Sequence, residues 1–221
     1  MKHLWDRSTS RIVPYLILLE AIATVLFYFS DHRYLLVTHW WYFVQGFGSL
    51  ILLAALEHRQ DLPLPFMDRV PYETILVVSL IGFAAIFLSG IVTSLVSPFF
   101  RGLSLAFVSN FGVGLSLHAG LSEESFKVGL TNIAVIIIRK TFAKTRSKKI
   151  DSAIVVLVGT GAVAVWAWMH AQFAYFSAES TFTVFVSGMA LFLLLLLSRN
   201  YLPIVGAHIL YDFLIVLALH Q

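Results

Sequence analysis

The chain has 221 residues, of which 59% are hydrophobic and only 12% are charged, and its formal net charge is +3 at pH 7. Soluble domains carry about a quarter charged residues, so this composition excludes an ordinary soluble protein and indicates a polytopic membrane protein. The absence of cysteine excludes disulfides, a thiolate nucleophile and cysteine-based zinc sites. Because one basic cluster supplies most of the positive charge, the charge does not suggest nucleic-acid binding.

Apolar runs in the first hundred residues predict three membrane-spanning helices, at Ile12–Phe29, Tyr34–Leu56 and Thr74–Ser97. A crossing of about 30 Å of hydrocarbon needs about 20 mainly apolar residues, so the first run is marginal in length. It carries Glu20 near its centre, which we interpret as a protonated or hydrogen-bonded residue facing the other helices. The basic N-terminus is followed by no small-residue cleavage site, so we expect an uncleaved first span.

The stretch Gly102–Ile138 is too long for one straight crossing, since a continuous helix of that length would extend roughly 55 Å. We expect one long kinked crossing, or a span preceded by a re-entrant piece, with Glu123 and Glu124 near the break. The basic loop Arg139–Lys149 holds six of the fifteen Lys and Arg residues and should face the cytoplasm. With a cytoplasmic N-terminus as well, an even number of crossings must separate the two, which favours one net crossing here.

Three further spans are expected at Ser152–Phe176, Thr181–Leu197 and Pro203–Leu219, which would leave the C-terminus outside. Neither an internal repeat nor a linker divides the chain. We therefore predict a single all-α, membrane-embedded domain over residues 1–221, multi-pass in the cell membrane, with about seven transmembrane helices.

Two adjacent carboxylates and a lysine interrupt the apolar sequence of the fourth predicted span. Lys127 follows Glu123 by four residues and Glu124 by three, so on a helix it can reach either carboxylate. An uncompensated charge at the bilayer centre costs at least about 2.5–3.5 kcal/mol, so intramembrane glutamates suggest a function. If Lys127 holds one carboxylate ionised, its crowded neighbour keeps its proton, which is a starting condition for acid and base chemistry.

Histidines occur in two later spans. His170 alone would be typical of a packed, singly hydrogen-bonded residue, and His118, near the predicted break, is expected to have a structural role. His208 and Asp212 are four residues apart on one helix face, and an aspartate can fix the tautomer of a neighbouring histidine. The alternative for this pair is a structural hydrogen bond between helices.

A shared polar cavity would satisfy these groups from separate spans most economically. Glutamates and histidines from different helices can activate water and stabilise an oxyanion, the two demands of amide hydrolysis. The same side chains are possible zinc ligands, but HExxH is absent and no pair has a dedicated zinc spacing. We therefore favour chemistry that needs neither a metal nor another cofactor.

In this order the motifs resemble those of the CPBP intramembrane proteases, which are related to type II CAAX prenyl proteases and have PrsW as a neighbouring branch. The family pattern is EExxxR, then FxxxH, then HxxxN or HxxxD, on successive membrane helices. Three places match it: the pair Glu123 and Glu124, the segment Trp166–His170 (WAWMH, with Trp for Phe), and His208–Asp212 (HILYD). The resemblance covers roughly Leu121–Leu219, within a motif-bearing core at about residues 102–219.

The sequence departs from the pattern of either branch. Lys127 gives EESFK, similar to the EExxK of the PrsW branch, and Asp212 also suits that branch. His170, however, stands where PrsW-like proteins carry glutamate, which favours the CPBP branch. The branch assignment is therefore left open.

The resemblance implies a glutamate-type intramembrane endopeptidase that hydrolyses a membrane-associated or hydrophobic peptide in the lipid bilayer without a metal. One glutamate, with His170, would activate the attacking water, and His208 with Asp212 would steady the oxyanion. The resemblance favours Glu123 as the base without deciding it, and Glu124 and Lys127 would then form an orienting pair.

Two other functions fit the same residues. One is a non-enzymatic membrane scaffold or bacteriocin-immunity-type protein, in which the motifs serve helix packing. The other is a proton-coupled carrier with Glu20, the glutamate pair and the histidines as a relay, although the absence of an inverted repeat counts against it.

Overall fold

The computed structural model describes residues 16–22, 36–57, 66, 68, 70–96, 113–142, 148–170 and 178–219. The long elements in these ranges are all α-helices, which confirms the all-α class: α3 (Leu36–Glu57), α4 (Tyr72–Val96), α6 (Val113–Thr141), α7 (Lys148–His170), α8 (Ala178–Ser198) and α9 (Leu202–Leu219). Residues 16–22 form a further short helix, the described part of the first predicted span.

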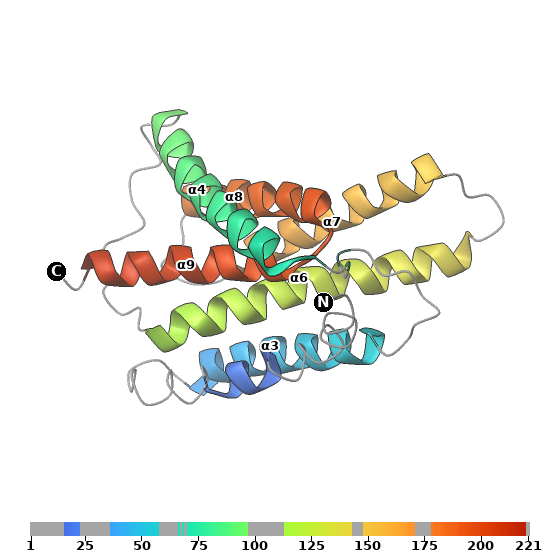
Figure 1. Ribbon diagram of the computed structural model, residues 1–221, viewed down its shortest axis with the longest axis horizontal. Helices are drawn as coiled ribbons and strands as arrows, with labels where there is room; N and C mark the ends of the chain where they lie inside the picture. The colour runs from blue at the N-terminus through green and yellow to red at the C-terminus, as the bar shows by residue number, and fades with distance from the viewer. Residues whose placement is uncertain are drawn as a thin grey trace.

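Helix α6 lies in the middle of the molecule. It packs against α3 on one side and against α7 and α9 on the other (Figure 1). Helix α4 packs on α8 and α9, and α7 packs on α8. The helix that carries the adjacent glutamates is therefore enclosed by other helices, and these shield its polar side chains from the surroundings.

The predicted break near the glutamate pair is wrong. Helix α6 continues through 29 residues, roughly 44 Å at about 1.5 Å per residue, with Glu123 and Glu124 inside it. Gly120 in this segment serves a close approach of helices, because a Cβ there would collide with the side chain and backbone of Ile209 in α9. The part of the predicted stretch that precedes α6, residues 102–112, lies outside the described residues.

The boundaries around the basic loop also differ from those predicted. Helix α6 continues through Arg139 and Lys140, and α7 already begins at Lys148, so the link between them is shorter than expected. Arg139 donates from Nε to Oδ1 of Asp151 at 3.0 Å and from a terminal nitrogen to Oδ2 at 2.8 Å. This two-point contact holds the end of α6 against the start of α7. The predicted extension of the fifth span to Phe176 lies outside the described residues.

Helices α7 and α8 run antiparallel with their surfaces closely matched. A Cβ on Gly159 would overlap the Phe192 ring, and a Cβ on Gly188 would meet Trp166. Both glycines therefore allow a large ring of the neighbouring helix to approach the helix backbone. The pairing places the start of α7 beside the end of α8.

The connection before α4 is hydrogen-bonded to the turn between α8 and α9. Tyr201 N donates to Phe66 O at 3.1 Å, and Asp68 N donates to Arg199 O at 2.9 Å. The Asn200 side chain donates to Asp68 O at 2.6 Å. Residues far apart in the sequence thus meet at one end of the bundle, the same end as the start of α7.

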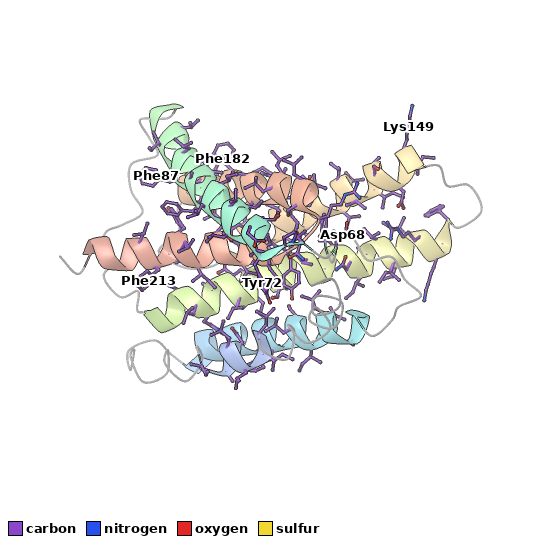
Figure 2. The ribbon with its side chains drawn as sticks, viewed as in Figure 1. Asp68, Tyr72, Phe87, Lys149, Phe182 and Phe213 are labelled. Atoms are coloured by element: carbon purple, nitrogen blue, oxygen red, sulfur yellow. The ribbon has the colours of Figure 1, made fainter. Side chains whose placement is uncertain are left out.

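Three helices are long and apolar enough to cross a membrane by length and composition, within the described residues: Tyr72–Val92, Lys149–His170 and Thr181–Ser198. Their outer faces expose large apolar side chains, among them Phe87 and Phe182, labelled in Figure 2. The polar side chains of α6 between Ser116 and Asn132, in contrast, are buried. Apolar residues outside and polar residues inside are what a bilayer favours, so the structure indicates a membrane-associated helical protein.

Candidate active site

The predicted site residues of α6 lie inside the bundle. Glu123, Glu124 and Lys127 are each no more than 5% exposed. Their spacing along a continuous helix directs them toward α7 and α9, the helices that carry the histidine motifs. Burial at this level requires each charge to be paired, because an isolated charge in an apolar interior is strongly unfavourable.

Glu124 is held by two donors at a single oxygen. Its Oε1 accepts from Lys127 Nζ at 2.6 Å and from His208 Nδ1, also at 2.6 Å. Lys127 belongs to the same helix as Glu124, whereas His208 comes from α9. Glu124 therefore links α6 to α9 and fixes the orientation of the His208 ring.

Glu123 meets a different set of groups. Its Oε2 accepts a hydrogen bond from Trp166 Nε1 at 2.9 Å, which links α6 to α7. His208 Nε2 lies 3.7 Å from that oxygen, and His170 Nε2 lies 3.7 Å from Oε1. Among the described residues, the carboxylate thus has one direct donor, Trp166, and an imidazole near each oxygen, just beyond hydrogen-bond distance.

His170 is oriented by the backbone of its own helix. Its Nδ1 lies 2.9 Å from the carbonyl oxygen of Trp166. A carbonyl oxygen only accepts, so Nδ1 carries the hydrogen and, in a neutral ring, Nε2 carries the lone pair on the side of Glu123. His170 is the last residue of α7 and its side chain is 14% exposed, so it lies at the edge of the buried cluster.

The role expected of Asp212 belongs largely to Glu124. Asp212 Oδ2 lies 3.6 Å from His208 Nε2, too far for a direct hydrogen bond. The other ring nitrogen, His208 Nδ1, lies 2.6 Å from Glu124 Oε1. The four-residue spacing did place His208 and Asp212 on one face of α9. The shorter contact comes from α6, and spacing within one helix cannot reveal a partner on another helix.

Trp166 contacts more of the cluster than its place in a motif suggests. Trp166 donates to Glu123, and Lys127 Nζ lies over its ring, 3.7 Å from the ring centroid. The same ring packs edge-on against the His170 ring, with 4.7 Å between the centroids. A cation over an indole face is attracted by the ring electrons. This sequence has Trp where the CPBP pattern that it resembles has Phe. Of these two side chains only Trp has an N–H donor, which the contact with Glu123 requires.

Glu20 and His118 form a separate buried pair. Glu20 Oε1 lies 2.5 Å from His118 Nδ1, and both side chains are no more than 1% exposed. His118 precedes Glu123 by five residues, which turns a helix by about 140°, so it leaves α6 from a different face. Glu20 was expected to be protonated or hydrogen-bonded and to face the other helices, but its pairing with His118 was not predicted. The pair lies apart from the glutamate cluster.

Within the described part of the chain, no group of three His, Asp or Glu side chains is placed to hold one metal ion. Independence from a metal remains a prediction. Comparisons with protein-family models, curated proteins and solved structures return no match to this chain.

Proposed function

We propose that this protein is a glutamate-type intramembrane endopeptidase that hydrolyses a membrane-associated or hydrophobic peptide with a water activated by Glu123. The observation that supports the proposal is the unequal environment of two adjacent buried glutamates. One oxygen of Glu124 accepts hydrogen bonds from both Lys127 and His208, whereas Oε1 of Glu123 lies near Nε2 of His170. Glu124 is thereby an orienting group, and Glu123 is the group suited to exchange a proton.

The first chemical step uses the space between Glu123 and His170. A water oxygen can lie about 2.8 Å from each of two atoms that are 3.7 Å apart, within hydrogen-bond reach of both. The water oxygen attacks the carbonyl carbon of the scissile bond while one of its protons passes to Glu123. A new C–O bond forms and the carbonyl electrons move to oxygen.

The second step breaks the C–N bond. In its doubly protonated form, His208 donates Nε2–H to the oxyanion, while Glu124 holds the other nitrogen and Asp212 adds negative charge beside the ring. The oxyanion collapses, and the proton on Glu123 passes to the leaving nitrogen. One water is consumed and two fragments with ordinary termini are released. Positioned general base catalysis of this kind contributes typically about 10²–10⁴-fold.

The proposal includes an arrangement in the membrane. About seven spans would enclose a polar cavity around Glu123, with the N-terminus and the 139–149 loop on the cytoplasmic side. The substrate is a peptide in or on the bilayer, and lipid surrounds the apolar faces of α4, α7 and α8. Since hydrolysis consumes water, the cavity must be hydrated.

A cleavage assay on purified protein in liposomes tests the proposal. A mixed library of hydrophobic, membrane-tethered peptides is incubated with wild type, Glu123→Gln and His208→Ala, each with and without a chelator, and fragments are read by mass spectrometry. We expect cleavage by wild type that resists the chelator and is lost in both variants. Loss of wild-type cleavage with chelator would instead require a metal.

A non-enzymatic scaffold or immunity-type protein is the competing function. The observation in its favour is that Glu124, Lys127 and His208 already satisfy one another as interhelical contacts do. A scaffold would show no cleavage by well-folded wild type across a broad library, and its partner binding would tolerate Glu123→Gln.

A further inference from the structure

Helix α6 has a second polar face, directed at α3 and distinct from the face of the glutamate cluster. His118, Ser122, Ser125 and Asn132 follow one another by four, three and seven residues, so about 3.6 residues per turn places them along one side. All four side chains are no more than 1% exposed. Helix α3 covers this side, since a Cβ on Gly46 would touch Ser122.

Several polar atoms on this face lack a hydrogen-bond partner among the described residues. They are the hydroxyl oxygens of Ser122 and Ser125 and both amide atoms of Asn132. A helical hydroxyl can bond a carbonyl of the preceding turn, as Thr131 does with Lys127 O at 2.8 Å. The two serines do not adopt that arrangement, so their hydroxyls remain available to a ligand between the helices.

The Glu20–His118 pair lies at one end of this row. A Cβ on Gly46 would collide with Glu20 Oε1 and would also contact Ser122, so the Glu20 carboxylate and Ser122 meet at the same point of α3. We name the row Glu20, His118, Ser122, Ser125 and Asn132 the α3–α6 seam. It combines a buried Glu–His pair with unpaired hydroxyl and amide groups.

We propose that the α3–α6 seam binds a file of internal water molecules running from the Glu20–His118 pair past Ser122 and Ser125 to Asn132. Buried waters typically make two to four hydrogen bonds to polar groups that the protein leaves unpaired. Ser122 and Ser125 are three residues apart, so they are separated by about 4.5 Å along the axis of α6. One water molecule can bridge this distance. A Cβ on Gly129, between Ser125 and Asn132, would lie 3.4 Å from Leu52 Cδ2, so the Leu52 side chain lies next to this part of the seam.

Water is the ligand that fits these atoms best. Hydroxyl and amide groups need both a donor and an acceptor, which water supplies and a bare cation does not. The groups are also spread along the helix and do not converge on one point, as metal ligands must. The inference depends on burial and unpaired atoms and is independent of peptide hydrolysis.

Radiolytic hydroxyl labelling tests the inference, because bound water generates radicals next to buried side chains. The probe residues are His118 and Leu52, since Leu52 contacts the position of Gly129. The control is Phe192, buried at 4% in the α7–α8 contact. We expect rapid labelling of His118 and Leu52 and none of Phe192, and a drop of about fivefold at Leu52 in Ser122→Ala/Ser125→Ala/Asn132→Leu.

Thermal stability of Asn132→Leu gives a second, independent reading. Removing an amide that binds water lowers the melting temperature, whereas removing one that is dry and unpaired raises it. Ser89→Ala is the matched control, since Ser89 already bonds Ile86 O at 2.7 Å. A higher melting temperature for Asn132→Leu, or labelling of Leu52 that does not fall in Ser122→Ala/Ser125→Ala/Asn132→Leu, would overturn the inference.

Discussion

Glu123 and Glu124 are neighbours in the sequence, yet a turn of about 100° per residue gives each a different helix to contact. Glu124 is joined to α9 through His208, and Glu123 to α7 through Trp166. The proposed choice of Glu123 as the base, which the sequence left open, rests on these contacts. Removing the charged partner Lys127 and removing the hydrogen-bond donor Trp166 should therefore have different effects on stability and on cleavage.

Trp166→Phe keeps an aromatic ring beside His170 but deletes the only direct donor to Glu123 among the described contacts. A hydrogen bond to a charged group is worth about 1.5–3 kcal/mol, so we expect cleavage to fall by roughly 10- to 100-fold with little change in melting temperature. Trp168→Phe, two residues on and 62% exposed, is the control and should cleave like wild type. Equal rates for the two variants would show that the indole N–H does not position the carboxylate.

Lys127→Met removes the cation from a buried group of carboxylates. Breaking one partner of a buried ion pair typically destabilises a protein by about 3–5 kcal/mol, because the other charge is left uncompensated. Lys140→Met, at the exposed end of the same helix, should change the free energy of unfolding by about 0.5 kcal/mol or less. Denaturant unfolding in micelles measures both, and similar small changes would mean that Glu124 does not depend on Lys127.

At the scale of the helices, the sequence predicted their type and approximate positions but not how they meet. Apolar runs located α4, α8 and α9 to within a few residues, because composition and length govern membrane helices. Polar residues and Gly120 were taken as a break in α6, whereas they mark its contacts with neighbouring helices. Glu123, Glu124, His208 and Asp212 are buried polar groups, as the sequence predicted. Their pairing, notably His208 with Glu124, depends on packing between distant segments.

Helix α7 provides a test of the packing with two glycines that differ in surroundings. Gly159→Ala places a methyl group in the Phe192 ring and should destabilise by about 1–3 kcal/mol. Gly161→Ala meets no atom within 4 Å and should stabilise the helix by up to about 1 kcal/mol. Denaturant unfolding of both variants is the measurement. Changes of the same sign would contradict the described contact of α7 with α8.

At the scale of the whole molecule, the connections give the bundle a defined polarity. The contact of Asp68 with Asn200 and the antiparallel pairing of α7 with α8 bring Asp68 and Lys149 toward one end, and Phe182 toward the other (Figure 2). The basic cluster that includes Lys149 predicts that the first end faces the cytoplasm.

The chain contains no cysteine, so single-cysteine labelling can test this orientation. In sealed vesicles of known orientation, a membrane-impermeant maleimide should label Asp68→Cys and Lys149→Cys from the cytoplasmic side only. Phe182→Cys should react only from the opposite side. Labelling of Asp68→Cys and Lys149→Cys from different sides would contradict the arrangement.

Catalysis by Glu123 is tested most directly by the cleavage rate of Glu123→Gln beside that of Glu124→Gln, each normalised to the folded fraction. If Glu123 is the base, Glu123→Gln remains folded and loses activity by at least about 10²-fold. Glu124→Gln instead lowers stability and retains measurable cleavage in its folded fraction, because it serves to orient Lys127 and His208. Full cleavage by folded Glu123→Gln, or loss of all cleavage only in folded Glu124→Gln, would contradict the account.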